Sequence, residues 1–486
     1  MASAAPPALG YDGLFRSLAR HARVFPLFSE RVSLLASPAD FYAQLLANVR
    51  GAERRITLSS LYLGTGALER ALVAAIAHRL RERPALRVRV VLDFSRGQRG
   101  GQDRSSVSVL KALLHEFPDN VELFLYKVPQ LRGAKAALPP PFNETMGVSH
   151  AKVYLVDDTL VLSGANLSED YFTNRQDRYV QMADCGALAE FYDQFVGVVA
   201  AFAYRVQLAR AGRAGERAEA RAYELVGGGD SSDSAAGRAA MKAAFEDLVA
   251  VRRHPQDALP DVLDASDAWA FPTIQFTPIG VTNDEAALRA LVQQLPANSS
   301  LRIASGYLNF PPFLKDLLVR CGAHLDVTLA APSANGFFNA AGVKGALPMA
   351  YSLLEQDFYE AARAARRGSG GYTTVLREFN RAHWTFHGKG MWWGPALESA
   401  PQLTVFGSSN FGRRSYGCDL ESQVVLFTTN PGLQARLQDE YAALAQHAEV
   451  VTDEVWTRPD RMLSGLFSWK TGHWIRPVAK LISSYL

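Results

Sequence analysis

The sequence predicts an α/β protein made of two similar lobes, each a mixed β-sheet flanked by helices, related by a pseudo-two-fold axis. Strand-like and helix-like segments alternate along the chain, which is typical of α/β layers. The order of these segments in the first half recurs in the second half, which indicates an internal duplication. The chain has 486 residues, of which 48% are hydrophobic. That length exceeds what one hydrophobic core usually organises, so two lobes are expected.

The first half begins with an amphipathic segment, residues 1–37, and continues with apolar residues at helical spacing between residues 41 and 49. Apolar runs at residues 55–64 and 86–92 predict two strands, separated by a second amphipathic helix. The second run leads into an arginine- and glycine-rich loop, residues 95–106. Functional loops of such sheets follow the carboxyl ends of strands, so we expect this loop to lie at the site.

The second half repeats this order. Residues 302–310 (RIASGYLNF) echo residues 55–64 (RITLSSLYLG), and residues 325–337 echo the strand and loop that start at Leu86. A glycine- and serine-rich stretch, residues 227–237, is the clearest linker signal in the chain. We therefore expect an N-terminal amphipathic segment (1–37), a first lobe (38–215), a linker or insertion (216–265), a second lobe (266–455) and an amphipathic C-terminal tail (456–486).

The composition argues against several classes of protein. The formal net charge is only +3 and no long basic stripe is present, so a nucleic-acid partner is not expected. The three cysteines, Cys185, Cys321 and Cys418, form no Cys-x-x-Cys pair, so neither a disulfide framework nor a structural zinc site is expected. A membrane-spanning helix needs about 20 consecutive apolar residues. The longest apolar run, residues 195–204, is shorter and predicts a buried helix.

One stretch of the first half carries a dense set of polar residues. His150, Lys152 and Asp157 form the pattern H-x-K-x4-D, and Asn166 and Asp177 follow. The histidine and the lysine are two residues apart, so on a strand their side chains point to the same side. Together these groups indicate a reactive site.

A second, altered copy lies in the other half of the chain. His387 and Lys389 repeat the first two positions, whereas Gly394 stands where the pattern requires the aspartate. Asn410 and Glu421 follow at the spacing of eleven residues that also separates the asparagine and the aspartate of the first copy. The matching spacing supports the pairing of the two copies, and the missing aspartate makes them unequal.

These residue types suit phosphoryl transfer. Two histidines can act as a nucleophile and a general acid/base. Two lysines and two asparagines can stabilise the oxygens of the phosphoryl group. A carboxylate can hold each histidine ring through its other nitrogen and fix the tautomer. The candidate catalytic residues are His150, Lys152, Asp157, Asn166, Asp177, His387, Lys389, Asn410 and Glu421.

The duplicated motif resembles that of the phospholipase D superfamily, in which H-x-K-x4-D is followed by G-[SA]-x-N, as in Gly407 to Asn410. The resemblance implies two phospholipase D-like lobes that share one active site. It also implies that one histidine attacks phosphorus to form a phosphohistidine while the other protonates the leaving group, with no metal cofactor required. We expect His150 to be the nucleophile and His387 to be the acid/base.

Longer segments narrow the resemblance. Residues 56–69, 92–100, 150–180 and 386–393 are similar to the eukaryotic, mitochondrial phosphatidylglycerophosphate synthase family. This similarity implies CDP-diacylglycerol as donor, glycerol 3-phosphate as acceptor, and phosphatidylglycerol phosphate and CMP as products. It further implies a peripheral, monotopic protein on the matrix side of the mitochondrial inner membrane. A divalent cation, Mg²⁺ or Mn²⁺, can then assist by binding the CDP diphosphate.

The implied acceptor is a dianion, so its site needs cations beyond the two motif lysines. Arginine suits a phosphate because its planar fork binds two oxygens at once. Candidates lie in the first-lobe loop, on either side of Asp177, and around Asn410. The candidate substrate-binding residues are Arg96, Arg99, Arg104, Arg175, Arg178, Ser409, Arg413 and Arg414.

Three alternatives remain open at this point. The chain can be a related phosphatidyltransferase that uses serine or phosphatidylglycerol as acceptor, or a phosphodiesterase. A catalytically inactive membrane scaffold is the third, and only the missing aspartate at Gly394 points to it. The C-terminal tail, which is rich in tryptophan and basic residues, either packs on the body or lies in a membrane interface. Nothing in the sequence specifies an oligomer.

Overall fold

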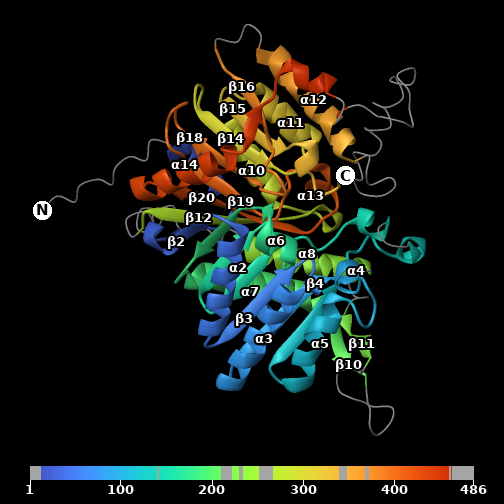
Figure 1. The fold of residues 1–486 in the computed structure, drawn as a ribbon. Helices are drawn as coiled ribbons and strands as arrows, with labels where there is room; N and C mark the ends of the chain where they lie inside the picture. Colours follow the sequence, from blue (N-terminus) through green and yellow to red (C-terminus); the bar gives the residue numbers. More distant parts are fainter. Residues whose placement is uncertain are drawn as a thin grey trace, which may run out of the picture.

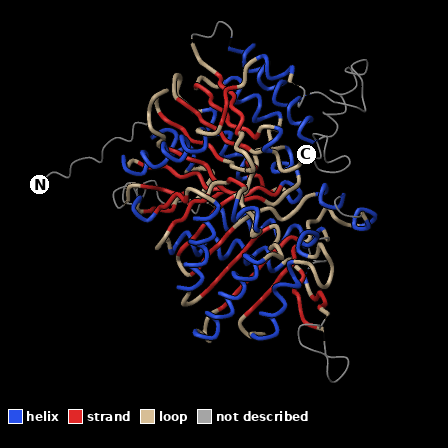
Figure 2. Tube along the Cα trace, in the orientation of Figure 1, coloured by secondary structure: helices blue, strands red, loops and turns tan. Residues whose placement is uncertain are grey.

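The computed structural model describes residues 12–138, 142–209, 222–228, 234–250, 266–338, 347–366, 371–458 and 461. These residues form two lobes, the first drawn in blue to green and the second in yellow to red (Figure 1). Each lobe is built on one large β-sheet of mixed direction, and helices cover the sheets (Figure 2). No helix within the described ranges is long and apolar enough to cross a membrane.

The first lobe contains a nine-stranded sheet with the strand order β11-β10-β5-β4-β3-β6-β7-β9-β2. Strands β3, β4 and β5 are parallel, and the strands from β6 to β2 continue in antiparallel fashion. The strands are β2 (Val32–Leu35), β3 (Arg55–Ser60), β4 (Arg87–Asp93), β5 (Val121–Tyr126), β6 (Val153–Val156), β7 (Thr159–Ser163), β9 (Tyr179–Met182), β10 (Tyr204–Leu208) and β11 (Tyr223–Val226).

Helices pack on both faces of this sheet. The first of them starts at Pro38 because the side chain of Ser37 caps it by accepting the backbone N–H of Asp40, and proline fits the first helical turn. Apolar residues of three helices, α2, α3 and α5, pack with those of the parallel strands in one core. The helices are α2 (Pro38–Gly51), α3 (Ala67–Glu82), α4 (Phe94–Gly97), α5 (Ser106–Glu116), α6 (Glu169–Thr173) and α7 (Gly186–Ala201).

The second lobe contains a ten-stranded sheet with the order β1-β12-β20-β19-β18-β14-β15-β16-β21, and β13 pairs with β12 beside this path. Its strands are β1 (Phe25–Leu27), β12 (Ala268–Phe276), β13 (Val281–Thr282), β14 (Ser300–Ser305), β15 (His324–Ala330), β16 (Thr374–Phe379), β18 (Gly390–Gly394), β19 (Leu403–Gly407), β20 (Glu421–Thr428) and β21 (Ala448–Val450). Its helices are α10 (Asn283–Gln293), α11 (Pro312–Arg320), α12 (Leu347–Arg366), α13 (Arg413–Gly417) and α14 (Pro431–Ala445).

The two sheets share one topology, as an internal duplication predicts. The order β5-β4-β3-β6-β7-β9 in the first sheet matches the order β16-β15-β14-β18-β19-β20 in the second. The directions match as well, because the first three strands of each series are parallel and the next three antiparallel. The fold is therefore the two-lobed α/β architecture that the sequence predicts.

A shared apolar layer joins the lobes. One core combines residues of both sheets with helices α7, α8 (Ala235–Val249) and α14. Phe195 of α7 lies against Phe245 of α8 with ring centroids 5.6 Å apart. Burial of aromatic rings between the sheets stabilises one arrangement of the lobes. The region between the lobes is thus a packed core, on which the site can be built.

Two segments differ from the simple division of the chain. The N-terminal segment reaches both lobes: helix α1 (Asp12–Leu18) and strand β1 pack on the second sheet, whereas β2 joins the first. The expected linker contributes β11 and the packed helix α8, and part of its glycine-rich stretch lies outside the described residues. The C-terminal tail also lies outside them, except for residues 456–458 and 461.

Candidate active site

Two short backbone pairings connect the motif histidines to the opposite lobe. Strand β17 (Thr385–Phe386) pairs in parallel with β8 (Arg175–Gln176), and the N–H of His387 donates to the carbonyl of Gln176 at 2.8 Å. In the same way, Ser149 and Leu420 form a parallel bridge. The N–H of His150 donates to the carbonyl of Leu420 at 2.9 Å. Each histidine therefore lies beside the residue that precedes the carboxylate of the other lobe.

As a result, the motif histidine of each lobe contacts the carboxylate of the other lobe. Nδ1 of His150 lies 2.9 and 3.0 Å from the two carboxylate oxygens of Glu421. Nδ1 of His387 lies 2.6 Å from Oδ2 of Asp177. An Nδ1–H that donates to a carboxylate leaves the Nε2 lone pair free for chemistry. Each motif histidine is thus paired with the carboxylate of the other motif copy.

The carboxylates are themselves held by neighbouring donors. Glu421 accepts hydrogen bonds from the hydroxyl of Ser408 and, at 2.8 Å, from the hydroxyl of Ser415. Asp177 accepts the backbone N–H of Arg178 at 2.8 Å. Such support fixes the orientation of the group that in turn orients the ring.

The motif lysines lie in the same buried centre. Nζ of Lys389 is 3.1 Å from Asp177 and 2.7 Å from Nδ1 of His387, and Nζ of Lys152 donates to the carbonyl of His150 at 2.7 Å. Only 1% of Lys389 and 2% of Lys152 is exposed. Burial lowers the pKa of both ammonium groups, which also interact electrostatically with each other. The two halves of the motif therefore meet at one place.

Burial also sets the protonation of the other groups. It lowers the pKa of His150 below 6.5 and lowers that of His387 further, so both rings are neutral at pH 7. Burial opposes the charge of Glu421, yet the adjacent His150 and Lys152 lower its pKa to about 2. The centre therefore combines neutral imidazoles with ionised carboxylates.

The motif asparagines offer unused polar groups at this centre. Oδ1 of Asn166 and Oδ1 of Asn410 are buried and accept no hydrogen bond within the described part of the chain. A buried acceptor without a donor is costly in a folded protein unless a ligand supplies one. The two oxygens are therefore available to a donor group of a substrate.

Comparisons with known proteins show the family. The chain is 35% identical over 483 residues to the mitochondrial CDP-diacylglycerol–glycerol-3-phosphate 3-phosphatidyltransferase of Gallus gallus, and the match covers 95% of this chain and 84% of that protein. The chain belongs to this family of phosphatidyltransferases. The protein of Homo sapiens with the same name is 35% identical over 479 residues, covering 95% of this chain and 84% of that protein. The protein of Saccharomyces cerevisiae, CDP-diacylglycerol–glycerol-3-phosphate 3-phosphatidyltransferase, is 30% identical over 469 residues, covering 90% and 86%.

A solved structure supports the fold of this phosphatidyltransferase. The crystal structure of phosphatidylserine synthase from Haemophilus influenzae Rd KW20 superposes with a TM-score of 0.73 at 21% sequence identity, covering 98% of this chain and 99% of that chain. At this identity the likeness concerns the fold alone. No protein-family model matches the chain.

In this phosphatidyltransferase, Asp157 is placed apart from the histidines, at the far end of β6. Its carboxylate accepts the backbone N–H groups of Glu53, Arg54 and Arg55, at 2.8, 2.7 and 3.0 Å, and so fixes the start of β3. We assign Asp157 a structural role instead of the expected place among the catalytic residues. The equivalent Gly394 has no room for a side chain, since a Cβ there would lie 2.8 Å from the carbonyl of Ser399.

The candidate substrate-binding arginines differ in whether they form ion pairs within the protein. Arg178 lies against Trp392, 3.8 Å from the ring centroid, and pairs with Glu440 at 2.7 Å inside the protein. Arg414 pairs with Asp419 at 2.9 Å. These contacts give Arg178 and Arg414 structural roles, which corrects their expected place at the substrate.

The remaining candidates differ in position. Arg96 and Arg99 both pair with Glu144. Arg104 is exposed on its loop, and no ion pair of Arg104 is found among the described residues. Ser409 is buried, and its hydroxyl accepts the backbone N–H of Phe411. Arg175 and Arg413 have no carboxylate partner within the described residues, and only Arg175 contacts the histidine centre, through Tyr171.

Several residues at the site lie outside the two motif copies. The hydroxyl of Tyr171 lies 3.4 Å from Nε2 of His387, and the ring of Tyr307 lies 5.9 Å from the His387 ring. Asp93 accepts the backbone N–H of Ser149 at 3.0 Å and so fixes the segment that leads into the first motif. Burial raises the pKa of Asp93 to about 6. Only the position of Tyr171 between the motif asparagine and aspartate hints at its role.

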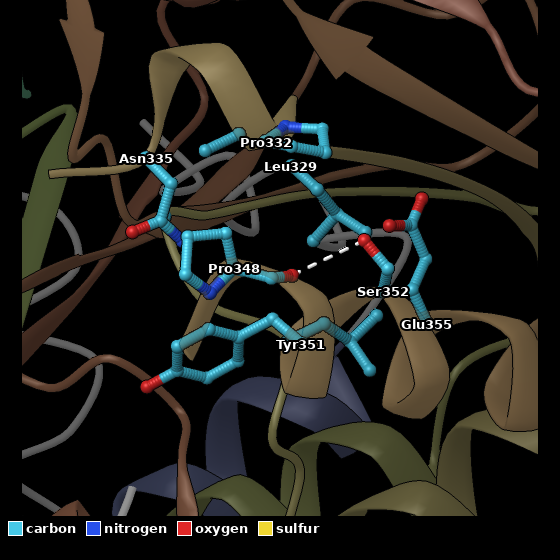
Figure 3. Close-up of a pocket in the computed structure, with 10 residues that line it drawn as sticks. Leu329, Pro332, Asn335, Pro348, Tyr351, Ser352 and Glu355 are labelled. Carbon is cyan, nitrogen blue, oxygen red and sulfur yellow. Dashed lines mark hydrogen bonds between the residues drawn. The ribbon is translucent and has the colours of Figure 1, made fainter. Parts of the chain in front are cut away.

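A small pocket lies in the second lobe (Figure 3). It is formed by residues that follow β14, by the end of β15 and the turn after it, and by the first turns of α12. A Cβ built on Gly306, one of its lining residues, would lie 3.2 Å from the Cα of His387. The ring of Tyr351, also in its wall, is 5.1 Å from that of Tyr307. The pocket is thus on the side of the centre that carries His387.

Proposed function

We propose that this site transfers the phosphatidyl group of CDP-diacylglycerol to glycerol 3-phosphate through a phosphohistidine on His150. The family membership supports the donor and the acceptor. The observation that carries the mechanism is the pair of crossed contacts, His150 with Glu421 and His387 with Asp177. Two oriented imidazoles in one buried centre, His150 neutral and His387 protonated once the donor is bound, can act on a single phosphorus from opposite sides.

In the first step, Nε2 of His150 attacks the phosphatidyl phosphorus. A nitrogen–phosphorus bond forms, the bond from phosphorus to the bridging oxygen breaks, and CMP leaves with a proton from Nε2 of His387. The dianionic diphosphate of the bound donor favours the protonated imidazole, which offsets the effect of burial on His387. In the second step, His387 takes the proton of the primary hydroxyl of glycerol 3-phosphate, whose oxygen displaces His150 and releases phosphatidylglycerol phosphate.

The surroundings of the two rings favour this order. Nδ1 of His150 hydrogen-bonds to the carboxylate of Glu421, so the proton on Nδ1 leaves Nε2 as a nucleophile. Nδ1 of His387 is shared between Asp177 and the ammonium of Lys389, and its Nε2 faces the hydroxyl of Tyr171. A ring with donors and acceptors at both nitrogens can hold or release a proton, which suits an acid/base.

The phosphoryl oxygens carry the negative charge in both steps. We assign their stabilisation to the ammonium groups of Lys152 and Lys389 and to the amides of Asn166 and Asn410. No step requires a metal ion. In the described part of the chain, no three His, Cys, Asp or Glu side chains gather to hold one, so an assisting Mg²⁺ or Mn²⁺ would bind through the CDP diphosphate.

The location follows from the substrates. The vertebrate relatives are named as mitochondrial proteins, and membership of their family supports a mitochondrial location. We propose a peripheral position on the matrix side of the inner membrane, because the acyl chains of the donor remain in a bilayer. The tryptophans and basic residues of the C-terminal tail suit an interfacial segment.

Labelled CMP tests the covalent step. The full chain, mixed with vesicles that contain CDP-diacylglycerol, is expected to incorporate labelled CMP into the donor without any acceptor. Addition of glycerol 3-phosphate is expected to give phosphatidylglycerol phosphate, whereas serine gives no product. Absence of exchange would contradict the covalent route, and transfer to serine would contradict the proposed acceptor.

The histidine variants complete this test. His150→Ala and His387→Ala are each expected to lose transfer by at least about 100-fold, since each removes one reacting group. His78→Ala, at an exposed position on α3, is the matched control. Appreciable turnover by either motif variant would refute a shared site.

A further inference from the structure

The two halves of the site carry different charges at equivalent positions. Nine residues beyond Asn166 the chain has Arg175, whereas nine residues beyond Asn410 it has Asp419. Because the two lobes share one topology, these positions lie in corresponding places around the centre. The crossed pairings put Arg175 in the His387 half and Asp419 in the His150 half.

The His150 half is closed by internal contacts. Asp419 pairs with Arg414 at 2.9 Å and accepts the backbone N–H of Val148 at 2.9 Å. The hydroxyl of Ser415 is directed to Glu421. Arg414 and Ser415 are thus held by Asp419 and Glu421, so neither of them is free to bind a second substrate.

The His387 half presents a half-buried cation instead, Arg175. Strand β8 places Arg175 opposite Thr385, two residues before His387, and Nε of the guanidinium donates to the threonine hydroxyl at 3.0 Å. Arg175 and Asp177 are two residues apart on an extended segment, so their side chains lie on the same side. The guanidinium stacks on Tyr171, 4.9 Å from the ring centroid, and Tyr171 contacts His387.

Among the candidate arginines, Arg175 combines this position with a free charge. No carboxylate pairs with it in the described part of the chain, whereas Arg96, Arg99, Arg178 and Arg414 all pair with one. Even a half-buried charge without a partner loses part of its hydration, and an anionic ligand offsets that cost. Arg413 also lacks a carboxylate partner among these residues, but it has no contact with His387 or Tyr171 there.

We propose that Arg175 binds the phosphate of glycerol 3-phosphate and directs this acceptor to the His387 half of the site. The inference rests on the proposed function and assigns one subsite within it. Glycerol 3-phosphate carries its reacting hydroxyl and its phosphate at opposite ends of a three-carbon chain. With the phosphate on the planar fork of Arg175, the hydroxyl can approach Nε2 of His387, which takes its proton. Arg175 then distinguishes a phosphorylated acceptor from a neutral alcohol.

The experiment compares glycerol 3-phosphate and glycerol as acceptors, with the full chain on vesicles that contain CDP-diacylglycerol. Arg175→Gln is expected to lower kcat/KM for glycerol 3-phosphate roughly 10- to 100-fold, mainly through KM, because charge-assisted hydrogen bonds are lost. The value for glycerol, which has no phosphate, is expected to fall much less. Arg320→Gln, at an exposed position at the end of α11, is expected to behave as the parent enzyme.

A second variant keeps the charge but moves it. A Cβ on Gly336 would lie 2.7 Å from Nη2 of Arg175, so Gly336→Ala displaces the end of this side chain. It is expected to raise KM for glycerol 3-phosphate less than Arg175→Gln does. An unchanged KM in Arg175→Gln, or an equal loss with both acceptors, would overturn the assignment. Loss of CMP exchange in Arg175→Gln would also overturn the assignment, because Arg175 would then bind the donor.

Failure of the proposed function gives a different result. In that case the unmodified enzyme itself does not transfer to glycerol 3-phosphate, or does not exchange CMP. The alternative is that the unmodified enzyme performs both reactions while Arg175→Gln leaves the KM for glycerol 3-phosphate unchanged. In that case only the assignment of the acceptor subsite is wrong.

Discussion

The carboxylate of Glu421 lies 2.9 Å from Nδ1 of His150, although the two residues belong to different lobes. The reciprocal contact joins Asp177 to His387 at 2.6 Å. The duplicated motif therefore does not make two independent sites. Each copy supplies the nucleophilic or acid/base ring to one pair and the orienting carboxylate to the other, so the chemistry depends on the packing between the lobes.

The crossed carboxylates are expected to be essential. Glu421→Gln and Asp177→Asn keep the shape of the side chain but no longer hold the imidazole with a charge, and each should lower kcat by at least about 100-fold. Steady-state transfer to glycerol 3-phosphate measures the loss. Glu360→Gln, on the exposed face of α12, is the control. Near-normal kcat in either crossed variant would remove the basis for the proposed pairing.

The acid limb of the pH profile should report the buried imidazoles. Burial lowers the pKa of His150 below 6.5, so the nucleophile stays neutral down to a lower pH than an exposed histidine. As the pH falls through this lowered pKa, kcat/KM for CDP-diacylglycerol is expected to fall. The charge of Glu421 raises the pKa of His150. In Glu421→Gln this pKa should therefore be lower, and the residual activity should decline only at a still lower pH. A shift of the acid limb to higher pH in Glu421→Gln would contradict the contact between His150 and Glu421.

Gly164 should tolerate no side chain, because it lies against the second motif. A Cβ built there would overlap Nζ of Lys389 and come 2.8 Å from Oδ1 of Asp177. Gly164→Ala is expected to displace the lysine and reduce kcat by about 10-fold or more. Gly51→Ala, whose Cβ meets nothing within 4 Å, is the matched substitution. Equal activity of the two variants would show that Lys389 has room to adjust.

Asp157 is expected to contribute to stability and not to chemistry. Asp157→Ala removes the acceptor of three backbone N–H groups and leaves alanine at a positive φ of 52°, a conformation that asparagine and aspartate tolerate better. The free energy of unfolding should fall by about 1–3 kcal/mol, measured by urea denaturation. Asp157→Asn should cost less. A catalytic role would instead appear as a loss of kcat in fully folded Asp157→Asn.

Arg178 provides a contrast to Arg175, three residues earlier. Its guanidinium pairs with Glu440 at 2.7 Å and donates to the carbonyl of Val405 at 2.8 Å, both inside the protein. Arg178→Gln leaves the carboxylate without its cation, which should cost about 3–5 kcal/mol of stability. The midpoint of thermal or urea unfolding measures this cost. A stable variant with an altered KM for glycerol 3-phosphate would mean that Arg178 reaches the substrate.

Much of the architecture follows from local patterns in the sequence. Alternating strand-like and helix-like segments predict α/β lobes, and their recurrence predicts the shared strand order. The spacing of His150 and Lys152 on an extended segment predicts that they act together. The equal distance from each motif asparagine to its carboxylate predicts that Asp177 and Glu421 are counterparts. These features depend on residues that are close in the chain, where periodicity and spacing are informative.

The packing between distant segments decides the rest. Arg175 and Arg178 are alike in the sequence, but only the cross-lobe pairing of β8 with β17 shows that one stacks beside His387 while the other is neutralised by Glu440. The same pairing decides which carboxylate holds which histidine. The sequence by itself determined the lobes, the motif residues and the type of chemistry. The tertiary structure decided the partners, because a contact between residues more than 200 positions apart depends on how two sheets pack and leaves no local pattern.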